Sequence, residues 1–349
     1  MPLEFQLCPA RMIGGDHPCF IIAEIGQNHQ GDLAIDCGAD CAKFQKSEIP
    51  LRFNRAALVR PYTSPNSWGP TYGEHKKHLE FSHDQYRELQ RYAAEVGIFF
   101  TASAWDEASV DFLHRLGVPF IKVASADANN LRQLEFTAKK GCPMVISSGM
   151  QNMDTMRRVY DLVKPLNPNF CFLQCTSTYP LDLNNVNLRV IQTFRKEFTD
   201  IPVGYSGHET GIAISIAAVA MGAKVLERHV TLDKTLKGSD HAASLEPNEL
   251  AELVRSVRCV ELAFGSPEKY RLPCEQSCAA KLGKSVVARV AIKAGATLTQ
   301  DMLAVKVAEP SGLPPEEIFN LQGRRVISDI KEDDTITADA LEPNNCSAK

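Results

Sequence analysis

The chain has 349 residues, which is long enough for one large domain with a small one, or for two medium domains. Its 44% hydrophobic and 23% charged residues are ordinary for a globular protein. The net charge of -4 gives no reason to expect a nucleic acid or a membrane surface as a partner, and no apolar run approaches the roughly 18 residues that span a bilayer.

The N-terminal segment MPLEFQLCPARMIGG lacks the basic start and apolar core of a signal peptide. The eleven cysteines are odd in number and include no Cys-x-x-Cys pair. Cys171 and Cys175 lie in an apolar run, where a free thiol behaves as a small hydrophobe. We therefore expect a reduced, cytoplasmic chain.

Eight short apolar segments, bounded by turn residues, recur through the first two-thirds of the chain. Most are continuously apolar, which is typical of strands buried on both faces of a parallel sheet. Helical stretches lie between them, for example at 83–96, 155–164 and 210–223. Eight such units predict an α/β fold, a (β/α)8 TIM barrel. The predicted strands are 20–26, 41–45, 98–103, 120–125, 144–149, 170–177, 202–208 and 224–230.

The connections after the first two strands depart from an ordinary barrel. Only 12 residues, QNHQGDLAIDCG, separate the strand ending near Gly26 from the strand beginning near Ala39. A parallel crossover needs a dozen or more residues and usually a full helix, so we expect the first barrel helix to be shortened or missing. The basic run HKKH at 75–78, in a long insert after the second strand, is predicted as a solvated face.

The sequence changes character after a helix predicted at 248–265. Residues 266–284 have the composition of a linker. Beyond them, 292–303 and 330–341 match at a 38-residue offset, and each is predicted as a strand, a turn and a Thr-capped helical turn. We therefore expect a barrel domain at 1–265, a linker at 266–284 and a small domain at 285–349.

Polar side chains end most of the predicted strands, where barrel enzymes build their active sites. His208 and His229 end the seventh and eighth strands, which are neighbours in a barrel. Two imidazoles at adjacent strand ends can bind one divalent metal and leave positions open for substrate oxygens. Structural roles for both histidines are the alternative.

Two lysines, Lys43 and Lys122, interrupt otherwise apolar strands. A buried lysine is costly unless an anion pairs with it, so with nearby hydroxyls they indicate a phosphate or carboxylate site. Internal Lys–Glu bridges and a Schiff-base lysine are the alternatives. The other candidates are the hydroxyls of Thr101, Ser125, Ser147 and Ser206 and the inward carboxylates of Glu24, Asp127 and Asp240.

Several segments together resemble the sialic acid synthase family: AEIGQNHQGD, AKFQKSE, KVASADANN, ISSGM, QCTSTYP, GYSGHETG and LERHVTLD. The resemblance runs from about residue 19 to the C-terminus, where the repeat is similar to the family's antifreeze-like domain. The stretch RPYTSPNSWGPTYGEHKKHLEFSHDQYRELQRYA is similar to the animal branch. Enzymes of that branch condense phosphoenolpyruvate with N-acetylmannosamine 6-phosphate and water to give N-acetylneuraminate 9-phosphate and phosphate.

The resemblance implies a role for each candidate residue. His208 and His229 would hold Mn²⁺ or Mg²⁺, which polarises the sugar aldehyde. Glu24 would stabilise the oxocarbenium cation or handle the proton of the attacking water. A homodimer with swapped C-terminal domains is also implied. Phosphoenolpyruvate would contact Lys43, Gln45, Thr101, Lys122, Ser125, Ser147, Ser177 and Ser206, and the sugar would contact Asp127, Tyr179 and Asp240.

The chain departs from the family at two places. Only residues 34–36 stand where the family has an extra helical stretch, in agreement with the short crossover. Ala124 and Ala126 replace glycines, and added methyl groups can obstruct a bound phosphate. Two alternatives therefore stay open. One is a catalytically inactive homologue or splice product that binds ligand or dimerises, and the other is a different phosphoenolpyruvate-condensing sugar-acid synthase.

Overall fold

The computed structural model describes residues 4–26, 28 and 38–343. The chain divides into two compact units, Met1–Gly265 and Ser266–Lys349. Eight parallel strands of the first unit are β3 (Phe20–Gly26), β4 (Cys41–Lys46), β5 (Phe99–Ala104), β6 (Ile121–Val123), β7 (Met144–Ser147), β8 (Phe170–Cys175), β9 (Val203–Gly207) and β10 (Val225–His229). They close in the order β10-β3-β4-β5-β6-β7-β8-β9, so the predicted barrel and all eight of its strands are confirmed.

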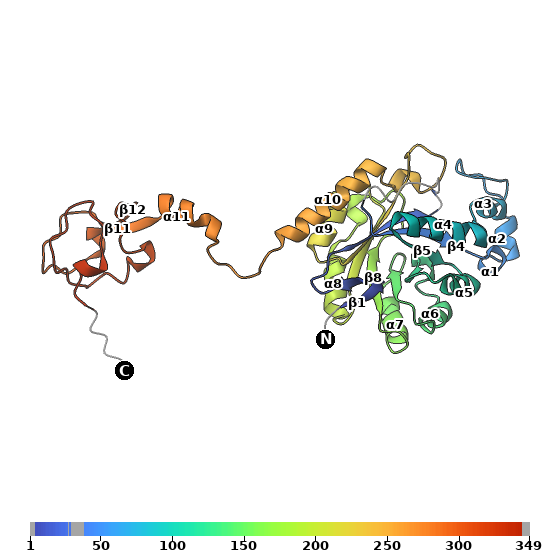
Figure 1. Cartoon of the computed structure of the whole chain (residues 1–349), viewed down its shortest axis with the longest axis horizontal. Coiled ribbons are helices and arrows are strands. Elements are labelled where there is room, and N and C mark those ends of the chain that lie inside the picture. Colours follow the sequence, from blue (N-terminus) through green and yellow to red (C-terminus); the bar gives the residue numbers. More distant parts are fainter. Residues whose placement is uncertain (1–3, 27, 29–37, 344–349) are drawn as a thin grey trace. The chain divides into compact units, whose positions relative to one another are not determined.

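Helices cover the outside of the barrel (Figure 1). They pack on outward side chains such as Ile21, Ala23 and Ile25. The helix predicted at 83–96 is confirmed as α4, and three others are confirmed with ends shifted by a few residues. The outer helices are α4 (His83–Val96), α5 (Glu107–Leu116), α6 (Leu131–Ala138), α7 (Met153–Val163), α8 (Arg189–Glu197), α9 (Ala213–Ala220) and α10 (Pro247–Ala263).

The inward side chains change along each strand from apolar to polar. Because successive side chains of a strand alternate between its faces, residues two apart share the barrel interior. In β3, Phe20 and Ile22 belong to an apolar cluster inside the barrel, whereas Glu24 lines a cavity at the end of the strand. The parallel register places His229 of β10 opposite Glu24. The fold therefore gathers polar groups at the C-terminal ends of the strands.

A hairpin that was not predicted from the sequence precedes the barrel. Its strands, β1 (Glu4–Cys8) and β2 (Arg11–Gly14), pair antiparallel. Phe5, Leu7 and Ile13 join the apolar cluster inside the barrel. The hairpin therefore closes the N-terminal end of the barrel and leaves the other end for a site.

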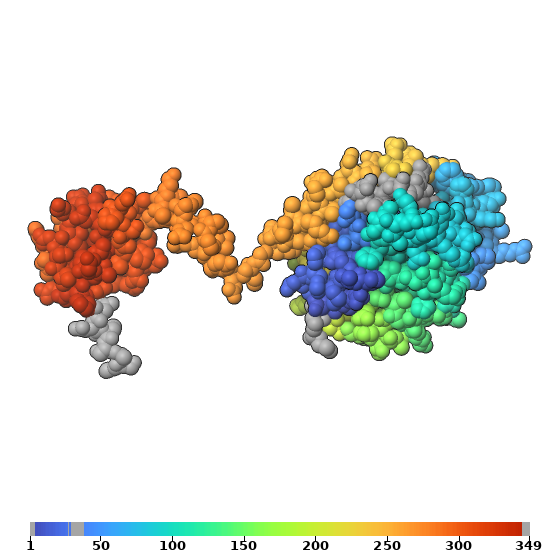
Figure 2. All heavy atoms as spheres, viewed as in Figure 1, coloured from blue at the N-terminus to red at the C-terminus, as the bar shows by residue number. Residues whose placement is uncertain are grey.

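Three short helices lie together at one side of the barrel unit, between β4 and β5 (Figures 1 and 2). They are α1 (Ile49–Arg52), α2 (Arg55–Val59) and α3 (Tyr72–His78). In α3, His75 is buried and Lys76 is half-buried, whereas Lys77 and His78 are exposed. The prediction of a solvated face at 75–78 is therefore wrong for the first half of that run, because α3 packs this side against the rest of the insert.

The expected loss of the first barrel helix concerns residues 29–37, which lie outside the described residues. Among the residues that are described, no helix lies between β3 and β4. The shortened helix therefore stays a prediction.

The second unit has its own apolar cluster, which includes Val286, Leu298, Val326 and Ile336. The predicted repeat is confirmed in its helical turns, because a 3-10 turn ends each copy. The strand predicted at the start of each copy is wrong, since Ile292 and Ile330 pair with each other only in an isolated bridge. Thr capping is wrong: Thr299 and Thr337 accept no backbone hydrogen bond and instead contact the carboxylates of Asp301 and Asp339. The regular elements are α11 (Gln276–Leu282), β11 (Lys284–Ala288) and β12 (Leu303–Val307). No helix in the described part of either unit has the length and apolarity for a membrane crossing.

Candidate active site

A cavity of about 270 Å³ opens at the C-terminal ends of the barrel strands. Each of the eight strands contributes at least one side chain to its lining. The fold thus brings together most of the residues that the sequence singled out. Those in the lining are Glu24, Lys43, Gln45, Lys122, Ser125, Ser147, Ser177, Tyr179, Ser206, His208 and His229.

Three predicted residues lie outside this lining. Thr101 is fully buried, and its hydroxyl donates to the carbonyl of Phe120. Asp127 ends the 3-10 turn η1 (Ser125–Asp127); its Oδ2 is buried without a hydrogen-bond partner, and burial raises its pKa to about 6. Asp240 lies beside the site, with Oδ2 3.8 Å from Nδ1 of His229.

The two buried lysines pair with two glutamates from other strands. Nζ of Lys43 contacts the carboxylate of Glu24 and lies 3.8 Å from Oε2 of Glu227. Nζ of Lys122 lies 3.3 Å from Oε1 of Glu227. These ion pairs offset part of the free-energy cost of burying the lysines. The alternative of internal Lys–Glu bridges therefore describes these contacts, and yet both lysines also line the cavity.

The two glutamates have opposite proton affinities. Burial raises the pKa of Glu24, although Lys43 opposes this. Burial also disfavours ionisation of Glu227, but the ammonium groups of Lys122 and Lys43 outweigh it and lower the pKa of Glu227 to about 2. Two carboxylates whose environments separate their pKa values are suited to different roles. Glu24 can take up a proton, whereas Glu227 stays ionised.

The two predicted metal ligands lie side by side, with ring centroids 5.3 Å apart. Nδ1 of His208 lies 2.8 Å from the carbonyl oxygen of Thr176; a carbonyl only accepts, so Nδ1 carries a proton and Nε2 is the nitrogen that a metal can take when the ring is neutral. Nδ1 of His229 is buried without a hydrogen-bond partner, and burial lowers the pKa of His229 to about 3. Among the described residues, no group of three His, Cys, Asp or Glu could hold a metal, so the chain offers two imidazoles here.

A close approach of backbone and hydroxyls forms another wall of the cavity. The N–H of Gly149 donates to Oγ of Ser125 at 3.0 Å. A Cβ on Gly149 would lie 2.6 Å from that oxygen and 2.2 Å from Oγ of Ser177, so only glycine fits. Ala124 and Ala126 also line the cavity, which places their methyl groups at its surface.

Sequence reasoning assigned no site role to Ser103, Trp105, Cys175 or Glu227, all of which line the cavity. Trp105 Nε1 is buried without a hydrogen-bond partner and is available to a ligand, whereas Glu227 Oε2 has no hydrogen bond but faces Nζ of Lys43. Ser103 and Glu227 are among the polar residues at the predicted strand ends, so the sequence located them without giving them a role.

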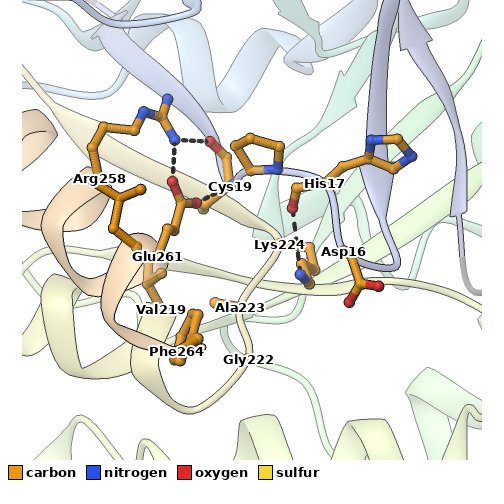
Figure 3. Close-up of a pocket in the computed structure, with 12 residues that line it drawn as sticks. Asp16, His17, Cys19, Val219, Gly222, Ala223, Lys224, Arg258, Glu261 and Phe264 are labelled. Atoms are coloured by element: carbon orange, nitrogen blue, oxygen red, sulfur yellow. Dashed lines mark hydrogen bonds and ion pairs between the residues drawn. The ribbon is translucent and has the colours of Figure 1, made fainter. Parts of the chain in front are cut away.

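A larger cavity, of about 440 Å³, lies at the opposite end of the barrel, beside the residues that precede β3 and β10 (Figure 3). Charged side chains in its lining make hydrogen bonds to backbone atoms and to one another. Arg258 donates to the carbonyl of Cys19 at 2.9 Å and to Glu261 at 3.0 Å. Barrel enzymes place chemistry at the C-terminal face, so we assign the site to the smaller cavity.

Comparison with known proteins identifies the family. A model of the NeuB family matches residues 32–269, which is more than half of the chain. The chain belongs to the NeuB family. A SAF domain model matches residues 283–342 of this NeuB-family chain.

The relatives of this NeuB-family chain include two mammalian synthases. It is 70% identical over 351 residues to N-acetylneuraminate-9-phosphate synthase of Homo sapiens, with 98% of both chains covered. It is 69% identical over 358 residues to the Mus musculus synthase of that name, with 100% of both covered. The alignment with the mouse synthase has 358 positions, whereas the chain has 349 residues. Relative to the mouse synthase, this chain therefore lacks residues at one or more internal places.

A solved structure supports the same assignment. The N-acetylneuraminic acid (sialic acid) synthetase from Leptospira borgpetersenii is 31% identical, with a TM-score of 0.69. The match covers 79% of the NeuB-family chain and 95% of that structure.

Proposed function

We propose that this chain condenses phosphoenolpyruvate with N-acetylmannosamine 6-phosphate and water to form N-acetylneuraminate 9-phosphate and phosphate, a step of sialic acid biosynthesis. The observation that carries the proposal is the full-length identity of 69–70% to mouse and human synthases named for that product. The cavity supports it, because two buried lysines and two imidazoles meet at the C-terminal face of a barrel.

The proposed reaction forms one C–C bond and breaks one C–O bond. C3 of phosphoenolpyruvate attacks the aldehyde carbon of the open-chain sugar, and an oxocarbenium centre results at C2. Water adds to C2 and loses a proton, the aldehyde oxygen gains one, and phosphate leaves with the electrons of the C2–O bond. Because phosphoenolpyruvate is already an enol derivative, no imine is needed and the Schiff-base alternative falls away.

The residues of the cavity have distinct roles in this proposal. Lys43 and Lys122 attract the anionic groups of phosphoenolpyruvate, and the hydroxyl of Ser147, which has no hydrogen-bond partner, is free to donate to them. Glu24 accepts the proton of the attacking water, for which its raised pKa suits it. Glu227 stays ionised and fixes the positions of the two ammonium groups.

We also propose that His208 and His229 hold Mn²⁺ or Mg²⁺. The unpartnered Nδ1 of His229 fits this role, and so does the imidazole of His208 once it gives up its hydrogen bond with Cys175; the remaining coordination positions are left for water and substrate oxygens. A bound ion of this kind acts as a Lewis acid on an aldehyde. Mn²⁺ should raise the melting temperature of the resting protein, and His208→Ala should remove this shift. An unchanged shift would exclude His208 from the metal site.

The family resemblance also supports a cytoplasmic homodimer with swapped C-terminal domains. The nine cysteines that the structure describes are all free thiols, as a reducing compartment favours. Size-exclusion chromatography with light scattering should give about twice the chain mass of 38.5 kDa. A mass equal to one chain would contradict the dimer.

Phosphate release from phosphoenolpyruvate tests the reaction. Purified protein with Mn²⁺ is given N-acetylmannosamine 6-phosphate, unphosphorylated N-acetylmannosamine or no sugar. Release that depends on the 6-phosphate is expected. No release with any sugar, from folded protein that binds phosphoenolpyruvate, would favour the inactive-homologue alternative.

A further inference from the structure

An unpaired arginine lies at the rim of the cavity. Arg52 ends helix α1, and its guanidinium carbon lies 3.6 Å from the ring centroid of Trp105, which lines the cavity. A second ring, that of Phe53, lies 4.8 Å from the same carbon. Within the described part of the chain, the guanidinium has these ring contacts but no hydrogen bond or ion pair. Cation–π stacking therefore holds the charge in place and leaves its N–H donors available.

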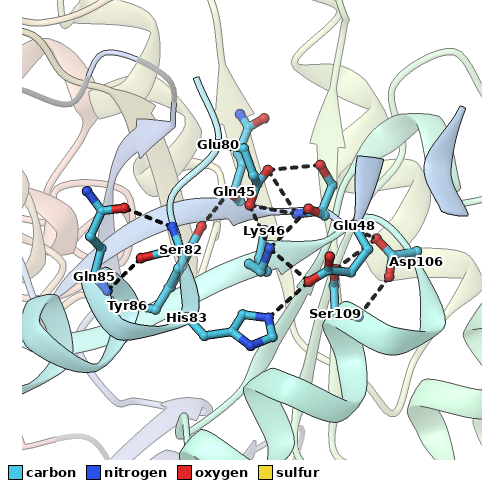
Figure 4. Close-up of polar contacts among 11 residues, drawn as sticks. Gln45, Lys46, Glu48, Glu80, Ser82, His83, Gln85, Tyr86, Asp106 and Ser109 are labelled. Atoms are coloured by element: carbon cyan, nitrogen blue, oxygen red, sulfur yellow. Dashed lines mark hydrogen bonds and ion pairs between the residues drawn. The ribbon is translucent and has the colours of Figure 1, made fainter. Parts of the chain in front are cut away.

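The carboxylates of Glu80, Asp106 and Asp127 favour the charged form of Arg52 from a distance. Glu80 and Asp106 accept hydrogen bonds from other groups (Figure 4). Glu80 accepts from Nζ of Lys46 at 2.8 Å and also from Ser47. Asp106 accepts from the backbone of Glu48 and from Ser109. The third acid, Asp127, has a pKa raised by burial to about 6 and makes no ion pair with Arg52. Among the described residues the guanidinium therefore has no ion-pair partner, and it lies beside Trp105, which lines the cavity.

The same network fixes where Arg52 stands. Glu48 is the N-cap residue of α1, and its N–H donates to Oδ2 of Asp106 at 2.7 Å. Asp106 directly follows Trp105 in the chain. This one hydrogen bond thus joins the helix that carries Arg52 to the segment that carries its stacking partner. Such a preformed donor binds a ligand without a large loss of side-chain entropy.

A second cation lies close to Arg52: Nζ of Lys76 is 5.4 Å from the ring centroid of Tyr72, and that ring lies 5.5 Å from the ring of Phe53, on which Arg52 stacks. Burial and the charge of Arg52 lower the pKa of Lys76, in α3, to about 8, while Asp240 and Glu80 oppose the shift. Lys76 therefore lies within electrostatic reach of Asp240, which is next to His229. Two cations that repel each other in a half-buried place are stabilised by a dianion.

We propose that Arg52 and Lys76 bind the phosphate group of the phosphorylated sugar substrate, a proposal that rests on the proposed function. An open-chain sugar phosphate carries its aldehyde and its phosphate at opposite ends. The aldehyde end belongs at the histidine pair, and phosphoenolpyruvate belongs at Lys43 and Lys122 inside the barrel. The short-helix insert between β4 and β5 then supplies the remaining anion site at the rim.

Steady-state kinetics of Arg52→Gln and Lys76→Gln test the proposal. We expect kcat/KM for N-acetylmannosamine 6-phosphate to fall ~10- to 100-fold in each variant, since a charge-assisted contact is lost. The KM for phosphoenolpyruvate and any turnover of the unphosphorylated sugar should not change. Arg52→Lys should recover part of the loss. Arg55→Gln, an exposed position in α2 of the same insert, is the matched control and should leave kcat/KM unchanged.

Three results would overturn the proposal: an unchanged kcat/KM for the 6-phosphate, an equal loss of kcat/KM for both sugars, or an equal change in the KM for phosphoenolpyruvate. Calorimetric titration of N-acetylmannosamine 6-phosphate separates this proposal from the proposed function. If the parent protein binds the sugar phosphate without turnover, the function fails, and weaker binding by Arg52→Gln still supports the subsite. Equal affinity of parent and variant, or no binding by the folded parent, refutes the subsite.

Discussion

Glu24 and Glu227 lie on neighbouring strands within reach of the same lysine, and yet they have opposite proton affinities. Glu227 lies between two ammonium groups, whereas Glu24 contacts one of them and is raised in pKa by burial. The environment of each carboxylate, and not its residue type, thus decides which of the two can act as a base.

Replacing Glu24 with Gln tests this assignment. We expect Glu24→Gln to lower kcat by about 10²- to 10⁴-fold, the range for loss of general acid–base catalysis, while phosphoenolpyruvate still binds. Single-turnover kinetics together with a binding titration measure the two effects separately. Should binding weaken while kcat holds, Glu24 serves the substrate complex and not the proton transfer.

Asp127 should oppose stability at neutral pH. The pKa of Asp127 in the folded protein, about 6, is above its ordinary value of 3.8, so ionising this carboxyl destabilises the folded state. The destabilisation is absent below pH 3.8, grows between pH 3.8 and 6, and is complete above pH 6. Asp127→Asn should therefore raise the melting temperature at pH 7.5 and make no difference near pH 4. Thermal unfolding at both pH values checks this, and an equal gain at both would contradict it. Lower affinity for the sugar is the expected functional cost.

At the scale of elements, Asp106 accepts hydrogen bonds from the beginnings of two helices. It caps α5 by accepting from Ser109, and it accepts from the backbone of Glu48 at the start of α1. Asp106→Ala should lower the free energy of unfolding by about 2 kcal/mol, since a cap and a second, part-buried hydrogen bond are lost. Asn152→Ala, which removes only the cap of α7, should cost about 1 kcal/mol. Urea unfolding that gives equal losses would contradict the double role.

Local patterns predicted the barrel strands and several helices because both depend on short-range periodicity. The β1–β2 hairpin escaped prediction because its apolar side chains acquire a partner only when the barrel closes above them. The position of Thr101 escaped for a similar reason. The strand that carries Thr101 was predicted correctly. Thr101 faces the barrel interior below the cavity, and this depth follows from the register of β5 with β4 and β6.

At the scale of the whole molecule, the second unit has a core of its own, and we expect residues 266–349 to fold when expressed alone. The fragment should show dispersed amide resonances and a cooperative thermal transition. Val326→Asp, which places a charge in the apolar cluster, should abolish both. A parent fragment without dispersion would mean that the unit depends on the rest of the chain.

The sequence by itself determined the eight strands, the repeat and the candidate set, because alternation, composition and motifs are properties of neighbouring residues. Tertiary structure decided which of those residues meet. Lys122 of β6 and Glu227 of β10 lie on opposite sides of the closed strand order and still approach to 3.3 Å. Arg52 and Trp105 come from different crossovers and stack only in the folded chain. Burial and pairing set the charge of each group, and both exist only once the barrel has closed.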